Sequence, residues 1–311
     1  MNDEAKRASA PSGWQERYQQ LTQQDWPASC LFMVATPIGN LADLSLRAWQ
    51  VLRDCDVIVA EDTRVTRHLL QGWGLDTPLW PVHRHNEAVM AQRVIERLHA
   101  GERVALVSDA GAPAVSDPGA RMVRAVRGAG LRVVPIPGPS AVIAALMATG
   151  VSTDHNPAFV FAGFAPSKGG ARRKWLEYWC FLAAPVVIFE TPHRLTAALA
   201  DLQVVCGPER IVHVARELTK RFEEVASLPL AEAGAWLAAR PQRRQGEFVL
   251  IVEAPPAVDT HAVHPDDQHL MDALLKKLSV RDAARILTDT GRLPRDAAYR
   301  LALERSESAA R

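Results

Sequence analysis

The feature that most constrains the fold is a short apolar run that ends abruptly in a loop of small residues. Residues 104–107 read Val-Ala-Leu-Val, a length typical of a buried strand. The loop at 108–113 contains Asp109 among small residues. The Asp-Pro-Gly sequence at 117–119 then predicts a helix start, with the Asp as N-cap and the Pro at the first helical position. This order places Asp109 at the carboxyl end of a strand, where open α/β sheets bind ligands. An Asp that only caps its own turn is the alternative.

A second rigid loop follows the next apolar run. Residues 135–139 contain three prolines and a glycine, and proline both fixes φ and removes a backbone donor. Ser140 and Ala141 then open an apolar helix predicted over residues 140–149. The first backbone N–H groups of that helix have no intrahelical partner. Two rigid loops at neighbouring strand ends therefore predict the floor of a ligand pocket.

Apolar runs alternate with helical patterns along most of the chain. The alternation predicts a mostly parallel sheet with helices on both faces, followed by a second, mixed sheet after a polar link at residues 152–157. The expected strands of the first sheet cover residues 31–35, 57–60, 79–82, 104–107 and 131–134. Those of the second cover residues 158–162, 186–190, 210–215, 222–226 and 247–252. A helical pattern with two breaks follows the Pro-Pro pair at 255–256.

These patterns predict an α/β protein made of two α/β domains and a small C-terminal helical domain. We expect a mobile extension over residues 1–29, an N-terminal α/β domain over 30–151, a C-terminal α/β domain over 152–256 and a helical tail over 264–305. The 311 residues, 48% of them hydrophobic, are enough for cores of that size.

The composition argues against several classes of protein. No apolar run approaches the length of a membrane span, and the first residues lack the apolar segment of a signal peptide, so we expect a soluble cytoplasmic protein. The four cysteines and the scattered histidines lack the spacing of a metal site, so no metal is expected. The glycine-rich fingerprints of dinucleotide and P-loop proteins are absent. The net charge of +1 does not by itself indicate a nucleic-acid partner.

A set of motifs resembles the tetrapyrrole-methylase superfamily, and within it the branch that 2′-O-methylates a cytidine ribose in small-subunit (16S) ribosomal RNA. The resemblance spans roughly residues 31 to 304, and its motifs, each weak alone, follow one another in family order. They are VATPIGNLADLSLRA, AEDTR, HRHNE, SDAGAPAVSDPG with PIPGPSA, FAGFAP, FETPHRL, VARELTK and QGEFVLIVE. The resemblance implies a methyltransferase that binds S-adenosylmethionine (SAM) in a cleft between the two α/β domains.

The resemblance also implies which residues meet the cofactor. In the first domain they are Pro37, Asp109, Ala110, Gly111, Ala112, Ser140 and Ala141, and in the second Thr191, Ala215 and Phe248. Ala112 departs from the family pattern, which has Thr at this place. The change removes a hydroxyl, but the glycine and the proline on either side keep the shape of the loop.

Four residues are candidates for a general base that removes the hydroxyl proton: Glu61, Asp62, His85 and Glu217. Because a sulfonium methyl group is already electrophilic, positioning is expected to dominate catalysis. The sequence does not choose among the four. Taken alone, the AEDTR segment favours an N-capping Asp62 or Thr63 with a local ion pair between residues three apart, and only the family pattern favours a functional role. Asn86 is a candidate cap for the helix that follows it, while His85 and Asn86 could also face the cleft.

Clusters of cations predict contacts with RNA phosphates. The cations are Arg64, Lys168, Arg172, Arg173, Lys174, Lys276, Lys277 and Arg281. Four of them stand at the start of a predicted helix, where positive charge opposes the helix macrodipole, and this mild cost suggests a use beyond solubility. A solvated helix start and a structural helical cap are the alternatives.

The expected partners are small-subunit rRNA or the 30S subunit at its decoding region, and a second copy of the chain in a homodimer, with no membrane partner. Two other functions remain open at this point. One is a tetrapyrrole (precorrin-type) C-methyltransferase, which shares the fold and the cofactor. The other is a non-catalytic module that binds SAM or RNA.

Overall fold

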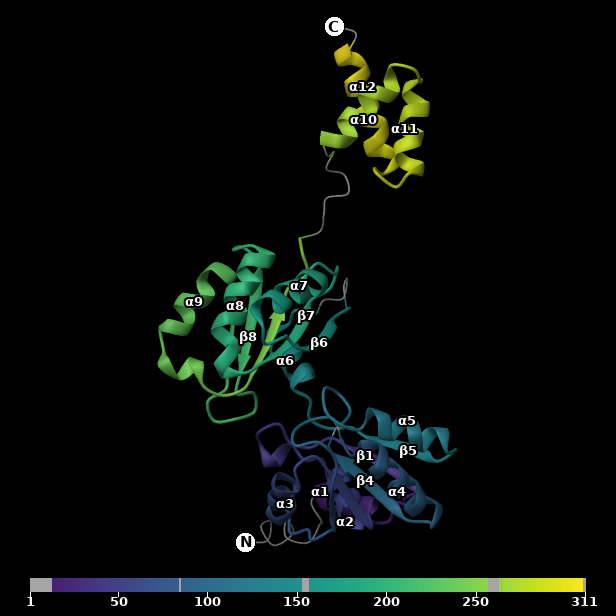
Figure 1. The fold of residues 1–311 in the computed structure, drawn as a ribbon, viewed down its shortest axis with the longest axis vertical. Helices are drawn as coiled ribbons and strands as arrows, with labels where there is room; N and C mark the ends of the chain where they lie inside the picture. The colour runs from purple at the N-terminus through teal and green to yellow at the C-terminus, as the bar shows by residue number, and fades with distance from the viewer. Residues whose placement is uncertain (1–12, 84, 153–156, 257–262, 264, 310–311) are drawn as a thin grey trace, which may run out of the picture. The chain divides into compact units, whose positions relative to one another are not determined.

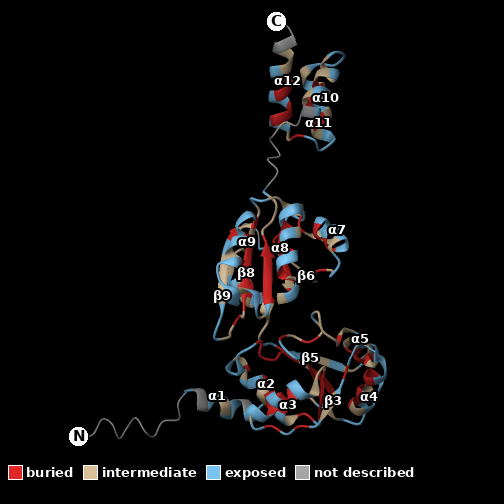
Figure 2. Cartoon of the chain, turned by 60° about the vertical axis from the view of Figure 1, so that its left-hand side comes forward, coloured by how far each residue is buried: buried red, intermediate tan, exposed pale blue. Residues whose placement is uncertain are grey.

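The computed structural model describes residues 13–83, 85–152, 157–256, 263 and 265–309. Within them the chain forms two compact units (Figures 1 and 2). The first unit extends to Cys180 and from Ala184 to Glu253, and it contains two five-stranded sheets. The second unit contains the segment from Ala254 onward, together with Phe181–Ala183.

The first sheet is entirely parallel, with the strand order β3-β2-β4-β1-β5. Apolar clusters cover both of its faces, as its nearly continuous hydrophobic strands predict. Every strand predicted for this half is present, and all bounds agree within two residues. The strands are β1 (Cys30–Val34), β2 (Val57–Ala60), β3 (Leu79–Pro81), β4 (Arg103–Val107) and β5 (Arg132–Ile136), and the covering helices are α2 (Leu46–Asp54), α3 (Thr63–Gly72), α4 (Glu87–His99) and α5 (Ala120–Gly128).

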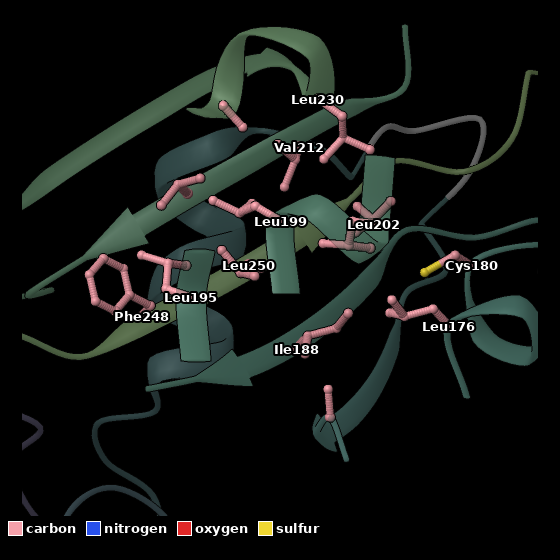
Figure 3. Packing of buried hydrophobic residues seen from close by; sticks show 14 of the residues in the cluster. Leu176, Cys180, Ile188, Leu195, Leu199, Leu202, Val212, Leu230, Phe248 and Leu250 are labelled. Atoms are coloured by element: carbon pink, nitrogen blue, oxygen red, sulfur yellow. The ribbon is translucent and has the colours of Figure 1, made fainter. Parts of the chain in front are cut away.

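The second sheet is mixed, as predicted, with the order β6-β7-β10-β8-β9. Only the β6–β7 pair is parallel. One face packs a large apolar cluster against three helices, as Figure 3 shows with Ile188, Leu199 and Leu250. The strands are β6 (Val160–Phe164), β7 (Val186–Glu190), β8 (Ile211–Arg216), β9 (Glu224–Pro229) and β10 (Phe248–Val252), and the helices are α7 (Gly169–Trp179), α8 (Pro192–Cys206) and α9 (Leu230–Ala238).

Helix α6 (Ala141–Thr149) joins the two halves of the first unit. It follows the last strand of the first sheet, yet Val142 and Ala145 pack on the second sheet with residues of β8 and β10. Ile38, from the loop after β1, belongs to the same cluster. This shared core fixes the strand-end loops of the first sheet against the second sheet.

The predicted start of α5 is wrong. The helix begins at Ala120 with Gly119 as N-cap, not at the Asp-Pro pair before it. The buried side chain of Glu87 supplies the capping acceptor instead: its Oε1 accepts hydrogen bonds from the backbone N–H groups of Gly119, Arg121 and Met122 at 3.1, 2.9 and 3.2 Å. A carboxylate from α4 therefore satisfies donors that a helix start leaves open.

Part of the predicted mobile extension is ordered. Residues Gly13–Thr22 form helix α1, and the Tyr18 ring lies 5.7 Å from Trp49 of α2. Trp26 is buried beside Phe32 of β1. Tyr18 and Trp26 thus pack on the first sheet and its helices, while residues 1–12 lie outside the described residues.

The second unit is a bundle of helices α10 (Pro265–Leu275), α11 (Val280–Asp289) and α12 (Arg295–Ala309), which matches the predicted helical tail. Met271, Leu287 and Ala298 lie in its core. None of the helices in the described ranges is long and apolar enough to cross a membrane.

Candidate functional site

A cavity of about 370 Å³ lies between the two halves of the first unit. It is lined by residues at the carboxyl ends of β2, β4 and β7, and by the start of β10. The two loops predicted as a pocket floor both contribute, through residues 109–112 and through Ser140 with Ala141. Ligands of open α/β sheets bind at this edge, so the rule used on the sequence located the cavity.

The loop after β4 is held in place by the end of β1. Backbone hydrogen bonds join Thr36 and Gly111 in both directions, at 2.9 and 3.0 Å, and the Thr36 hydroxyl donates to the Ser108 carbonyl. Gly111 has a φ of +78°, a conformation that favours glycine. Asp109 Oδ1 accepts a hydrogen bond from the backbone N–H of Asp62 at 2.9 Å. The ends of β1, β2 and β4 are therefore tied together below the cavity.

The Asp62 carboxylate is used in local hydrogen bonds at the start of α3. Asp62 is the N-cap of this helix, and its carboxylate accepts bonds from the backbone N–H, Nε and Nη2 of Arg64. These hydrogen bonds lower the pKa of Asp62 to about 2. A carboxylate with so low a pKa is a weak general base, so the capping alternative describes Asp62 better than a catalytic one. The Arg64 side chain is 89% exposed at this rim.

Two helices begin at the cavity. Ser140 is the N-cap of α6 and Thr191 is the N-cap of α8, and neither side chain makes a capping hydrogen bond. Both residues line the cavity. The start of a helix is suited to an anionic group such as a carboxylate, because its unpaired N–H groups and its dipole both favour negative charge.

The loop after β8 closes the second half of the site. Lys220 Nζ donates to Glu217 Oε1 and Glu247 Oε2, each at 2.8 Å. Glu217 Oε1 also accepts the backbone N–H of Glu247 at 2.9 Å. The Lys220 side chain lies over Gly39, where a Cβ would stand 2.5 Å from the lysine Cγ. The glycine of the TPIGN turn therefore permits the close approach of the two halves.

These contacts reduce the set of general-base candidates. Burial alone would raise the pKa of Glu217, but the hydrogen bonds from Lys220 and from the backbone of Glu247 outweigh it and lower that pKa. Glu217 has a structural task and does not line the cavity, and exposed His85 does not line it either. Asn86 stands at the N-cap of α4, but its side chain bonds to the backbone of His83 and Pro81 instead of capping the helix. Of the four candidates, only Glu61 lines the cavity.

The lining is acidic and partly apolar. Its carboxylates are Glu61, Asp109, Asp117, Glu190 and Glu247, and its larger apolar side chains are Ile38, Val115, Val142, Phe164, Phe189, Leu218, Phe248 and Val249. Among the described residues, no lysine or arginine belongs to this lining. The cavity is therefore suited to a ligand that carries positive charge, hydroxyl groups and apolar surface, and unsuited to a polyanion.

Most residues expected at the cofactor do meet at this cavity: all of them except Pro37 belong to its lining. Sequence reasoning missed several others, among them Ile38, Phe164, Phe189, Glu190 and Glu247. Each stands within four residues of the end of a strand, inside a motif already singled out. Their position at strand ends was the signal, but Phe189 lay inside the strand predicted over residues 186–190, and Phe164 lay two residues after the one predicted over 158–162.

The residues expected to bind RNA fall into two groups. Arg172 is removed from the set, because its side chain is only 6% exposed, forms a 2.6 Å ion pair with Asp201 and donates to the Ser167 carbonyl. The others lie on the surface. Arg64, Lys168, Arg173, Lys174, Lys276, Lys277 and Arg281 are exposed. No group of three possible metal-ligating side chains occurs in the described part of the chain.

Comparison with known proteins gives consistent matches. A family model for tetrapyrrole (corrin/porphyrin) methylases matches residues 31–234. The "Ribosomal RNA small subunit methyltransferase I" of Xylella fastidiosa is 46% identical over 270 residues, which cover 86% of this chain and 97% of that protein. The protein of the same name from Pseudomonas aeruginosa is 43% identical over 281 residues, covering 89% of this chain and 98% of the relative.

Solved structures share the fold at low sequence identity. A cobalt precorrin-4 methyltransferase of cobalamin biosynthesis gives a TM-score of 0.54 at 13% identity, covering 72% of this chain and 94% of the other. A uroporphyrin-III C-methyltransferase from Thermus thermophilus, complexed with S-adenosyl homocysteine, gives 0.50 at 17% identity, with coverage of 71% and 96%.

Proposed function

Since the chain belongs to the ribosomal RNA small subunit methyltransferase I family of the tetrapyrrole methylases, we propose that its cavity binds SAM and directs the methyl group to a cytidine ribose 2′-hydroxyl of 16S rRNA. The chain is a SAM-dependent methyltransferase of small-subunit rRNA. The ribose position, the cytidine and the decoding region of the 30S subunit are the finer parts of the proposal. The acidic cavity between two helix starts is the observation that supports it most directly.

The residues around the cavity fit SAM. The lining carboxylates, Asp109 among them, are suited to the ribose hydroxyls and the positive charges of the cofactor, and the starts of α6 and α8, at Ser140 and Thr191, are suited to its carboxylate. Ile38 and Phe248 offer apolar surface. Residues 30–151 and 152–256, as two domains, would each contribute one wall. When bound, the cofactor supplies an electrophilic methyl group.

Positioning is the main task of the protein, and Glu61 is the proposed general base. It follows β2 directly and lines the cavity beside the Asp62–Arg64 cap. The exposed Arg64 guanidinium is placed to hold a phosphate at the rim, so that the adjoining ribose enters and Glu61 takes the proton from its 2′-oxygen. Glu61→Gln should lower kcat by roughly 10²-fold or more and weaken SAM binding far less, because Gln keeps the size and the hydrogen-bonding oxygen of the side chain. Unchanged kcat would exclude Glu61 as the base.

The electrostatics of the cavity favour RNA over a tetrapyrrole as substrate. A precorrin-type ring carries several carboxylates, and a lining with five carboxylates and no lysine or arginine favours such a ring less than an RNA chain, even though Glu190 and Glu247 are paired with Arg194 and Lys220. An RNA chain can keep its phosphates outside and insert one ribose. The exposed cations of the helical unit, Lys276, Lys277 and Arg281, are available for such phosphates. A reaction on ribosomal RNA also places the enzyme in the cytoplasm.

A homodimer is part of the proposal. Helix α6 is apolar on all sides, and the face turned away from the second sheet exposes Ile143 and Met147, the latter at 80%. Exposed apolar side chains grouped on one helix are typical of an interface. Light scattering should give about twice the 34.1 kDa monomer mass, and Met147→Glu should shift that mass to the monomer. A wild-type mass near 34.1 kDa at micromolar concentration would refute the dimer.

Transfer of labelled methyl groups tests the proposed substrate. The protein is incubated with labelled SAM and either undermethylated 30S subunits, free 16S rRNA or uroporphyrinogen. Label is expected in the rRNA of at least one RNA substrate and not in the tetrapyrrole. Label in uroporphyrinogen would establish the C-methyltransferase alternative. SAM and RNA binding without any transfer would establish a non-catalytic module.

A further inference from the structure

Helix α5 carries a row of arginines to which the site described above gives no role. Over residues 120–132 the chain has Arg121, Arg124, Arg127 and Arg132 and no acidic residue, although acids and cations nearly balance in the whole chain, at 35 and 36. All four arginines are exposed. A segment that concentrates positive charge within a nearly neutral chain is an electrostatic footprint with a definite place in the fold.

The three helical arginines share one face. Met122 and Val126 are fully buried and face the first sheet, so they fix which side of α5 points inward. Residues at successive intervals of three lie within an arc of roughly 120° and rise about 9 Å from the first to the third. Arg121, Arg124 and Arg127 therefore form an outward row, which we name the α5 arginine row. Its length matches two or three phosphates at about 3.4 Å of duplex axis each.

The row has no acidic partner within the described part of the chain. No ion pair joins its three members to any acid among the described residues, in contrast to Arg97 on the adjacent α4, which pairs with Glu102. Unpaired guanidinium groups keep all their donors for an external ligand, and their planar fork fits phosphate oxygens in a bidentate way. Arg121 also stands in the first turn of α5, where a cation opposes the helix dipole.

The row is also connected to the cavity. Asp117 lines the cavity, α5 begins three residues later, and the Glu87 carboxylate fixes the backbone of Gly119, Arg121 and Met122. The row thus starts near the rim and leads away from it along the helix. A polyanion held on this row would be fixed in position relative to the loop that lines the site.

We infer that the α5 arginine row binds the sugar–phosphate backbone of the substrate rRNA, next to the nucleotide that enters the cavity. This inference rests on the proposed function for the identity of the RNA. The row contacts phosphates, which are the same in every RNA sequence. It therefore contributes affinity and orientation, and the cavity selects the nucleotide. Its contribution weakens as salt rises, because binding releases counterions from the RNA.

The test compares two variants with matched charge. R124Q/R127Q removes two members of the row and leaves Arg121, the one nearest the cavity, in place. R240Q/R244Q removes two exposed arginines from the short helical turn between α9 and β10, where Arg240 is the N-cap and Arg244 the last residue. Filter binding to 30S subunits and to 16S rRNA is measured between 50 and 200 mM salt, and SAM affinity and thermal midpoints are measured for each protein. Exposed Arg→Gln changes alter helix stability little.

R124Q/R127Q should bind RNA roughly 10–50-fold more weakly at 0.1 M salt, and its log–log salt slope should be smaller by about 1.4–1.8. Its SAM affinity and thermal midpoint should equal those of the wild type. R124K/R127K, which keeps the charge, should recover most of the affinity, and R240Q/R244Q should resemble the wild type.

Wild-type affinity and slope in R124Q/R127Q would show that the row is only a solvated face. An equal loss in R240Q/R244Q would show that net charge, and not this face, matters. A wild type that binds RNA through the row but transfers no methyl group would refute the proposed function and leave this inference standing. A wild type that does not bind RNA would refute both.

Discussion

Replacing Glu87 by Ala should destabilise the fold and weaken cofactor binding together. Glu87 is 5% exposed, and one of its carboxylate oxygens accepts hydrogen bonds from three backbone N–H groups at the start of α5. Alanine leaves those donors without an acceptor in a site that water reaches poorly. The loop that lines the cavity ends at this helix start, so a disordered helix start also displaces residues that line the cavity.

The size of the effect follows from the contacts. A buried donor left unsatisfied costs about 1–3 kcal/mol, and loss of a carboxylate at a helix N-terminus costs about 0.3–2 kcal/mol. Because a single oxygen accepts all three bonds, the terms overlap, and we expect Glu87→Ala to lower the free energy of unfolding by roughly 3–5 kcal/mol. Glu87→Gln keeps an acceptor oxygen and loses only the charge, so a loss of about 1–2 kcal/mol is expected.

Urea unfolding and calorimetric titration with SAM measure both effects. Besides the stability loss, the Kd for SAM should rise at least about tenfold in Glu87→Ala, equivalent to about 1.4 kcal/mol. Without the Glu87 carboxylate the cavity-lining loop before α5 is less ordered, and ordering it costs part of the binding free energy. Glu96→Ala, an exposed change on the same helix, is the control and should match the wild type. A Glu87→Ala protein within about 0.5 kcal/mol of the wild type, with unchanged SAM affinity, would refute the role given to this carboxylate.

Three further predictions concern the cofactor, the helical unit and pH. Asp109→Ala should weaken SAM binding roughly tenfold or more, by removing a lining carboxylate and its bond to the Asp62 backbone; exposed Asp76 is the control, and equal Kd values for the two variants would count against the site. K276Q/K277Q/R281Q should lower RNA affinity and its salt dependence but not SAM affinity, and full RNA affinity would make the helical unit a structural cap. Burial lowers the pKa of His213 although Glu253 opposes the shift, so the folded state binds that proton less tightly than the unfolded chain. Stability should therefore fall as pH drops below about 6.5, and His213→Gln should flatten the decline measured by urea unfolding.

The sequence predicted the sheets and the position of the cavity well because local patterns determine both. Strands such as Val57–Ala60 and Val186–Glu190 are short apolar runs between turn formers, and their observed bounds equal the predicted ones. The loops with Asp109 and Ser140 follow strands directly, so the geometry of a parallel sheet brings them to one edge.

Three of the failures involve partners that lie far apart in the sequence. The α5 cap comes from Glu87, 32 residues before Gly119. The local Asp-Pro pair had predicted a different helix start, because an Asp N-cap followed by Pro is a common start by itself. Arg172 looked like a surface cation until Asp201, 29 residues later, paired with it in the interior. Glu217 looked like a free carboxylate because its contact with the Glu247 backbone crosses from one strand end to the next. Sequence spacing alone does not report such tertiary contacts.

Nucleoside analysis of the methylated RNA tests the central claim most directly. Small-subunit rRNA is methylated by the wild-type protein with labelled SAM, digested to nucleosides and resolved by mass spectrometry. The account predicts label in 2′-O-methylcytidine and in no other nucleoside, and its loss with Asp109→Ala at limiting SAM. Label on a base or on another nucleoside, or no label in RNA while a tetrapyrrole is methylated, would contradict the account.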